Sequence, residues 1–180
     1  MSDNYIVELN PPKKPTEMRT SFITEKNEIE EILDGLSTCF VGMNEADGSP
    51  YVIPMNFGYL DGNIILHSGP HAKHLDLLAR DNRVCVTFCT ENNQLMCQHP
   101  DVACSYSVAS KSVLFKGRIE FVEDMEEKEQ LIKAFMKHYI TREFKISAPA
   151  IRNVKVWLLR PEKVTAKAFG QNFRNTKSPV

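Results

Sequence analysis

The sequence has little net charge and lacks a long apolar run. Lysine and arginine together number 22, aspartate and glutamate 23, and the formal net charge is -1. No overall positive field would therefore attract nucleic acid. No apolar stretch approaches the roughly 20 residues that a membrane-spanning helix needs, and the N-terminal segment lacks an apolar signal core. We expect a cytoplasmic protein with neither nucleic-acid nor membrane partners.

The cysteines lack the close pairing that structural zinc sites usually show. Five are present and none forms a C-x-x-C pair: Cys39, Cys85, Cys89, Cys97 and Cys104. An odd number without an export signal indicates reduced thiols rather than a disulfide framework. Cys85 and Cys89 alternate with apolar residues, which is typical of small core residues. Since the histidines of residues 67–74 also lack a carboxylate at helical spacing, no metal site is expected.

A glycine-rich G-x-G-x-x-G motif and an alternating strand–helix pattern are both absent, which argues against a Rossmann fold. The 180 residues, 42% of them hydrophobic, suit one domain with a substantial core. Residues 1–17 carry prolines and little periodicity and are interpreted as an extended arm. The globular domain is expected over residues 18–168, and residues 169–180 as a C-terminal tail.

Within that domain, short β-rich segments dominate. Strands are expected at residues 37–44, 51–60, 63–68, 83–90, 103–108, 112–123, 154–160 and 163–169. Asp61-Gly62 is a strong hairpin signal. Residues 91–101 are polar and loop-like, and the last two strands are expected to pair as a hairpin. Helices are expected at 24–36, capped by Thr24, at about 72–80, and at 124–139, capped by Asp124. This pattern predicts an antiparallel barrel with peripheral helices.

The stretch HSGPHAKHLDLL at residues 67–78 holds a candidate phosphate site. A strand there runs into a helix, and a helix N-terminus offers free backbone N–H groups to an anion. Ser68 can add a hydroxyl, and Lys73 and His74 can add cationic or donor groups. The alternative is structural: Ser68 caps the helix, Lys73 is solvated and His71 is a surface residue.

A second candidate lies in the strand YVIPMNFGYL at residues 51–60. Pro54 removes a ladder hydrogen bond and so marks an edge or a bulge. Asn56 and Gly58 bring a polar and a side-chain-free position into the same strand. A planar ligand could press against the backbone there, or the segment is a simple β-bulge.

These residues together resemble the FMN-binding split barrel of the pyridoxamine 5'-phosphate oxidase superfamily, and within it the nitroimidazole-resistance (Nim-type) branch. The first block is PMNFGYLDGNIILHSGPHAKHLDLLARDNRVCV, which matches the branch at Pro54, Phe57, Tyr59, Gly62, His67, Ser68, Pro70, Lys73, Leu77, Asn82 and Arg83. The second is ACSYSVASKSVLFKGRIEFVED, which matches at Cys104, Ser112, Val113 and Gly117. The resemblance covers roughly residues 18–168.

The resemblance implies a mainly β fold with peripheral helices, a six-stranded antiparallel split β-barrel that forms a homodimer with two FMN sites at the interface. Backbone contacts to the flavin ring are expected from Pro54, Met55, Asn56, Phe57 and Gly58. Contacts near the phosphate are expected from His67, Ser68, Lys73, His74, Lys111 and Ser112. Two departures stand out: Ser110-Lys111 replaces a usual Tyr-Arg, and lysine lacks the bidentate fork of arginine. Ala72 replaces a common glycine in the phosphate loop.

Such a protein would pass electrons from a nicotinamide donor through FMN to a small acceptor such as a nitro compound. Flavin carries that chemistry, and the protein supplies placement and electrostatics. His71 is the candidate acid or base, because an ordinary histidine titrates near neutrality. Trp157 is expected to pack in the core or beside the flavin. The alternatives are a non-catalytic FMN-binding or storage protein, and a split barrel that binds haem or another ligand. A pyridoxamine-phosphate oxidase itself is not favoured, since Arg174 is the only late arginine.

Overall fold

The computed structural model describes residues 20–90, 94–97, 99–143 and 145–170. The expected N-terminal arm and almost all of the expected C-terminal tail lie outside these residues. Within the described chain, no helix is both long enough and apolar enough to cross a membrane.

All strand pairs are antiparallel, as the sequence predicts. The strands are β1 (Ser21–Ile23), β2 (Cys39–Asn44), β3 (Pro50–Met55), β4 (Gly58–Leu60), β5 (Asn63–Ser68), β6 (Arg83–Cys89), β7 (Gln94–Cys97), β8 (Tyr106–Val122) and β9 (Lys155–Phe169). The sheet order is β3-β2-β6-β8-β9-β5-β4, with β1 on β9 and β7 on β8. The helices are α1 (Lys26–Asp34), α2 (Lys73–Arg80), α3 (Met125–Lys137) and α4 (Ala148–Arg152), with a 3₁₀ turn at Ala103–Ser105.

The sheet closes on itself through the chain rather than through a hydrogen-bonded seam. Its two end strands, β3 and β4, are consecutive in the sequence and are separated only by Asn56 and Phe57. Counted as one broken strand, they make six barrel strands together with β2, β5, β6, β8 and β9. The barrel is therefore split at the break, and the predicted fold class is confirmed. Pro54 lies on the edge strand β3, whose register with β2 is regular from residue 50 to 55, so it marks an edge and not a bulge.

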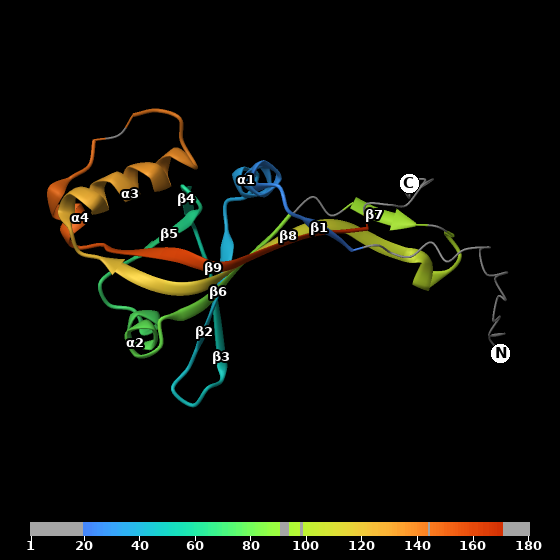
Figure 1. The fold of residues 1–180 in the computed structure, drawn as a ribbon, viewed down its shortest axis with the longest axis horizontal. Helices are drawn as coiled ribbons and strands as arrows, with labels where there is room; N and C mark the ends of the chain where they lie inside the picture. The colour runs from blue at the N-terminus through green and yellow to red at the C-terminus, as the bar shows by residue number, and fades with distance from the viewer. Residues whose placement is uncertain (1–19, 91–93, 98, 144, 171–180) are drawn as a thin grey trace.

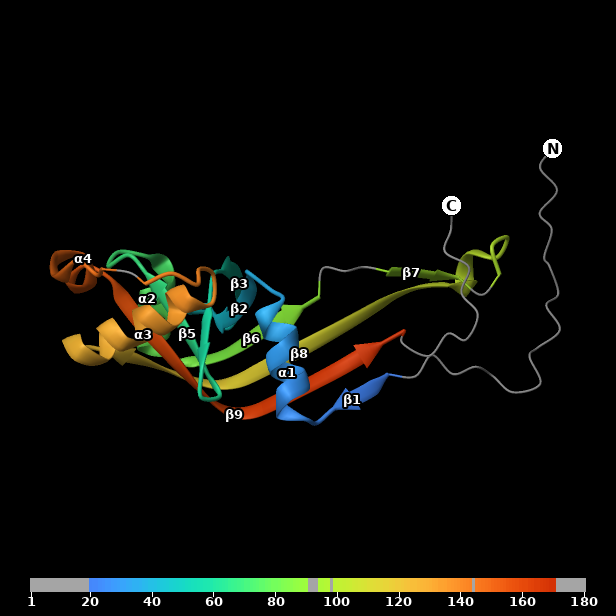
Figure 2. The same ribbon diagram turned by 90° about the horizontal axis from the view of Figure 1, so that it is seen from above.

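β8 and β9 are each one long strand, which corrects two expectations. The sequence predicts two strands in 103–123, and a hairpin between 154–160 and 163–169. Instead β8 spans 17 residues and β9 spans 15. β9 continues through Pro161, and its pairing with β8 shifts register there, opposite Lys116 and Gly117. As a result the β8–β9 ribbon, with β1 and β7 beside it, projects beyond the barrel on the side away from α2 and α3 (Figures 1 and 2).

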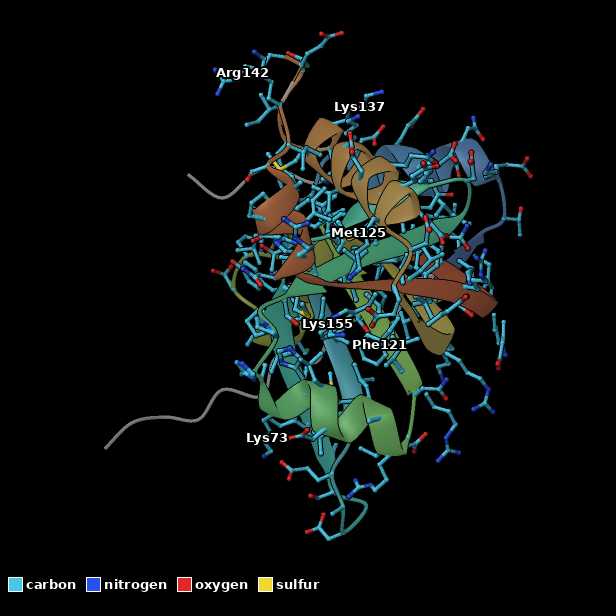
Figure 3. The ribbon with its side chains drawn as sticks, turned by 90° about the vertical axis from the view of Figure 1, so that its left-hand side faces the viewer. Lys73, Phe121, Met125, Lys137, Arg142 and Lys155 are labelled. Atoms are coloured by element: carbon cyan, nitrogen blue, oxygen red, sulfur yellow. The ribbon has the colours of Figure 1, made fainter. Side chains whose placement is uncertain are left out.

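Two apolar layers flank the sheet. The barrel interior contains residues of β2, β5, β6 and β8 together with Trp157 and the apolar face of α2. A second layer lies between α3 and strands β5, β8 and β9. Side chains of β5 alternate between the two layers: Ile64 and Leu66 face the interior, whereas Ile65 faces α3. In Figure 3 α2 and α3 accordingly lie on opposite sides of the sheet.

Most local signals in the sequence act as expected, with a few corrections. Asp61 and Gly62 both have positive φ, 51° and 87°, which is the geometry of a type I′ hairpin turn. The Asp124 side chain caps α3 by accepting from two backbone N–H groups. At α1, however, the N-cap is Glu25 and has no side-chain cap bond; Thr24 donates instead to the Glu25 carboxylate. β7 lies in the segment expected to be a loop, while β1 and α4 are additional elements.

Candidate functional site

The turn from β5 to α2 leaves the N-terminus of α2 without a side-chain cap. The N-cap residue is Ala72, in extended backbone with φ −151°, and it makes no side-chain cap bond. Ser68 Oγ donates to Gly69 O at 3.1 Å and so does not cap the helix, which removes the capping alternative. A β-carbon at Gly69 would meet nothing within 4 Å. Thus no side-chain cap satisfies the first N–H groups of α2, and the space next to Gly69 in the preceding turn is open.

Lys73 is exposed to solvent but paired. Its Nζ lies 2.6 Å from Glu45 Oε1 and 4.6 Å from the centroid of the Tyr51 ring. The hydrogen bond with Glu45 raises the pKa of Lys73 above its ordinary value. Both partners belong to the β2–β3 hairpin, so this hairpin lies next to the N-terminus of α2. Figure 3 shows Lys73 on α2, across the sheet from Lys137 of α3.

His67 and Ser68 lie on opposite faces of β5. The His67 ring packs edge-on against Phe135 of α3, with centroids 4.5 Å apart, whereas Ser68 follows the inward positions Ile64 and Leu66. Burial lowers the pKa of His67, so the imidazole is neutral at pH 7. The structure therefore brings Ser68 and Lys73 to one side of the turn and places His67 beneath α3.

His74 points inward from α2. Its ring lies 4.8 Å from that of Trp157, which is fully buried, so the expectation that Trp157 packs in the core is confirmed. Burial also lowers the pKa of His74. His67 Nδ1, His74 Nε2 and Trp157 Nε1 are buried and lack a hydrogen-bond partner. Such nitrogens usually have a bound water or another ligand. His71, by contrast, is exposed on the turn.

The backbone of Phe57 and Gly58 is covered by α3 and the residues directly after it. Phe57 N–H donates to the Tyr139 hydroxyl oxygen at 2.8 Å, and that hydroxyl lies 2.8 Å from Phe57 O and 2.9 Å from Ser37 O. A β-carbon on Gly58 would come within 2.6 Å of Phe135 Cα. These two residues therefore have a packing role, and any flat ligand would meet the strand through other residues.

The remaining three expected ring contacts lie at the end of β3. Pro54 is exposed and pairs with Phe40 of β2. Met55 packs partly against the core. The Asn56 side chain is exposed and donates to Ser37 O at 2.9 Å. Pro54 and Asn56 are thus the members of this group that present side chains to solvent.

Lys111 and Ser112 lie far from this turn in the same chain. Ser68 pairs with Lys155, whereas Ser112 pairs with Lys167, twelve residues further along β9. At roughly 3.3 Å per residue the strand between them is on the order of 40 Å long. Adjacent strand residues also point to opposite faces, so Lys111 and Ser112 do not form one cluster. Lys111 pairs with the buried Ala168, and its backbone is bonded to Thr90.

Ser112 belongs to a partly apolar face of the sheet, here called the outer face. The strand register makes two rows of neighbouring residues on this face. One row is Pro54, Phe40, Thr87 and Leu114, and the other is Cys89, Ser112, Lys167 and Phe22. Three large apolar side chains are widely exposed on it: Phe22 (69%), Val52 (59%) and Phe40 (48%). Large apolar side chains exposed on one face of a sheet indicate a contact surface.

The cysteines do not cluster. Cys39 and Cys97 are buried, but Cys85 is half-buried and Cys89 exposed. The expectation that Cys85 and Cys89 are core residues is therefore wrong, because both alternate along β6 with the inward residues Val84, Val86 and Phe88 and face outward. Within the described residues, no group of three or more His, Cys, Asp or Glu side chains is placed to hold a metal ion.

An antiparallel barrel left open between the two halves of one strand is a split β-barrel. The sequence model of the pyridoxamine 5'-phosphate oxidase family matches residues 25–168 of the chain. The chain therefore belongs to the pyridoxamine 5'-phosphate oxidase family. Among curated proteins, no match was found.

Solved structures agree with this assignment. A proposed 5-nitroimidazole antibiotic resistance protein from Bacteroides thetaiotaomicron VPI-5482 is 44% identical, with a TM-score of 0.76 over 84% of this chain and 88% of that one. The resemblance to the nitroimidazole-resistance branch is thereby confirmed. Flavocytochrome Anf3 from Azotobacter vinelandii (18% identity, covering 88% and 72% of the two chains) and an FAD- and heme-binding protein from Mycobacterium smegmatis (16%, covering 87% and 75%) both have a TM-score of 0.71. At these identities they show the fold alone.

Two residues of the site carry no clear signal in the sequence. Tyr139 is recognisable as part of the apolar face of the helix expected over residues 124–139, but its hydroxyl contact with Phe57 joins residues 82 positions apart. Glu45 lies in the turn-like segment EADGSP and contacts Lys73 28 positions later. Only the packing of the hairpin against α2 brings that pair together.

Proposed function

We propose that this protein is an FMN-dependent oxidoreductase that passes electrons from a nicotinamide donor to a small acceptor such as a nitro compound. The observation that supports this most strongly is the uncapped N-terminus of α2 beside Ser68 and Lys73. It occurs in a chain 44% identical to a proposed 5-nitroimidazole resistance protein. A helix N-terminus with a hydroxyl and a lysine suits a phosphate ester.

The residues of the turn fit the phosphate of FMN. A side chain on Gly69 would enter open space, so the turn has room for a ligand there. Ala72 departs from the usual glycine of this loop, but its φ of −151° is ordinary extended backbone and its methyl group causes no strain. Ser68, the N–H groups of α2 and Lys73 would hold the phosphate. Pro54, Met55 and Asn56 would border the ring, because Phe57 and Gly58 are covered by α3.

A homodimer is part of the proposal. Ser112 and the α2 turn lie on the order of 40 Å of strand apart in one chain. They can approach the same ligand only if each comes from a different copy. The outer face exposes Phe40 and Val52 next to Pro54 and carries Ser112 as well. A second copy on this face would bury these side chains and bring its own Ser112 toward the site. Because Lys111 points to the opposite face, the geometry favours Ser112 as the shared residue.

The chemistry supplied at this site when FMN is bound is hydride acceptance from the donor and electron delivery to the acceptor. His71 lies exposed on the turn, where it can give a proton to an acceptor or take one. The buried, neutral His67 and His74 have pKa values lowered by burial. They therefore do not add positive charge to the site near neutral pH.

The visible absorption spectrum of the purified protein, before and after addition of NADH or NADPH, tests the function. We expect flavin bands that bleach with the donor and recover with a nitro acceptor. Lys73→Gln should lose most FMN affinity, whereas Lys163→Gln, an exposed lysine on β9, should not. Flavin bands that persist with either donor would favour the storage alternative, and a Soret band would favour haem. A colourless protein that does not bind added FMN would refute the proposal.

A further inference from the structure

Glu45 lies where a ligand phosphate would have to compete with it. Its carboxylate oxygen is 2.6 Å from Lys73 Nζ, and Lys73 is the first residue of α2. The lysine ammonium is also above the Tyr51 ring, at 4.6 Å. Without a ligand, the only lysine of the phosphate turn is therefore directed toward the β2–β3 hairpin and partly neutralised by it.

The hairpin holds Glu45 in this place independently of Lys73. Glu45 N–H donates to Ser49 O at 2.8 Å and Gly48 N–H donates to Glu45 O at 3.1 Å, which closes the turn. Asn44, one residue earlier, donates its side-chain amide to Asp81 Oδ2 at 3.1 Å. The Asn44–Asp81 hydrogen bond joins the hairpin to the C-terminal end of α2. Loss of the Glu45 charge should therefore leave the hairpin in position.

The Lys73–Glu45 pair is exposed and easily exchanged. The side chains are 55% and 31% exposed, and ion pairs of this kind contribute on the order of 0.2–1 kcal/mol. A phosphate is a stronger partner for lysine than a single carboxylate because it carries up to two negative charges. Lys73 can thus turn to a phosphate at little cost, but the Glu45 carboxylate then remains nearby and repels it.

On the basis of the proposed function, we propose that Glu45 is a specificity-determining residue that competes with the ligand phosphate for Lys73. It weakens the binding of phosphorylated flavin and leaves unphosphorylated flavin unaffected. The protein then discriminates less strongly between FMN and riboflavin than the turn alone would allow. Replacing the carboxylate by an amide should restore the full contribution of Lys73.

The test compares dissociation constants for FMN and riboflavin, measured by flavin fluorescence quenching, in the wild type and in Glu45→Gln. We expect Glu45→Gln to bind FMN about two- to fivefold more tightly and riboflavin unchanged. The matched control is Glu129→Gln, which removes the same charge from a similar pair, that with Lys133 on α3. It should change neither constant. In a Lys73→Gln background the effect of Glu45→Gln should shrink.

Two results would overturn this assignment: unchanged FMN affinity in Glu45→Gln, or an equal change for FMN and riboflavin, which would indicate an effect on the hairpin. If the wild type binds neither flavin, the proposed function fails separately. Calorimetric titration with inorganic phosphate then decides the role of Glu45. Tighter phosphate binding in Glu45→Gln than in the wild type supports it, and equal or absent binding in both refutes it.

Discussion

Gly58 is the residue at which α3 comes closest to the barrel. A β-carbon there would lie 2.6 Å from Phe135 Cα and 3.2 Å from Phe135 N, and backbone atoms cannot move aside as a flexible side chain can. Gly58→Ala should therefore push α3 away from β4 and lower the free energy of unfolding by about 1–3 kcal/mol. Urea denaturation measures this change.

The control for this substitution is Gly35→Ala at the end of α1. There the nearest atom to a new β-carbon is 3.7 Å away, and the backbone φ is negative. Gly35→Ala should change stability by less than about 1 kcal/mol. Equal destabilisation by both substitutions would mean that the close approach of α3 to Gly58 is not what the glycine provides.

His67 gives the fold a predictable dependence on pH. Burial lowers its pKa below the ordinary 6.5, so the unfolded chain binds a proton at a pH where the native chain does not. The free energy of unfolding should then fall as pH drops below about 6.5 and level off only below the native pKa. His67→Phe, which keeps an aromatic ring beside Phe135, should lose less stability between about pH 7.5 and 5.5. Thermal melts across this range measure it; parallel profiles would contradict the assignment to His67.

At the scale of single residues, the sequence predicts well where the reason is local. Asp61-Gly62 forms its turn because both residues tolerate positive φ, and Asp124 caps α3 because its acceptor lies within two to three residues of the donors. Lys73 could not be placed in this way. Its ion pair with Glu45 depends on how a hairpin packs against a helix, and no local pattern specifies that.

The hydroxyl group of Tyr139, two residues past the end of α3, joins the C-terminal end of this helix to the barrel break. Tyr139 Oη lies between Phe57 N, Phe57 O and Ser37 O. Tyr139→Phe would leave the buried Phe57 groups without a partner, at a cost of about 1–3 kcal/mol. We expect a matching loss of unfolding free energy and faster hydrogen exchange at the Phe57 amide.

Tyr106→Phe is the matched control for the hydroxyl. Its hydroxyl donates to Pro100 O at 2.9 Å in an exposed setting, where water can replace the lost bond. This substitution should cost less than about 1 kcal/mol. Unchanged exchange at Phe57 in Tyr139→Phe would show that α3 is held to the break mainly by its apolar contacts.

At the scale of elements, the expected strands are mostly present but their continuity is not predictable from local signals. Pro161 reads as a break between two strands, yet β9 continues through it with a register shift. The extra residue of β9 at this shift is Glu162, directly after Pro161, and a proline is tolerated beside such a break in the ladder. Conversely, the segment expected as one strand over 51–60 is broken at Asn56 and Phe57, because the barrel closes at that point.

The whole molecule explains why the candidate site could be predicted only in part. The phosphate turn is one contiguous stretch, so its members Ser68 and Lys73 are recognisable from the sequence. Ser112 carries the same kind of signal, yet it pairs with Lys167, twelve residues along β9 from the partner of Ser68. A site shared between two copies cannot be assembled from the geometry of one chain. If the proposed dimer forms, the sequence indicates the residues of the site but not which copy supplies each.

A charge on the outer face should separate the two copies and weaken FMN binding together. Phe40 is 48% exposed and pairs with Pro54 and Thr87, so Phe40→Glu costs the single chain little but places a carboxylate against the same face of a second copy. In a two-fold interface the substitution buries two carboxylates, one from each copy, and neither has a partner of opposite charge. Sedimentation should show the mass of a dimer for the wild type and of a monomer for Phe40→Glu, with FMN affinity reduced at least about tenfold.

The control is Met125→Glu, on α3 away from this face and 37% exposed, which should change neither the mass nor the FMN affinity. A Phe40→Glu protein that stays dimeric would exclude the outer face as the interface, and a monomer that still binds FMN fully would show that one chain holds the ligand without Ser112 of a second copy.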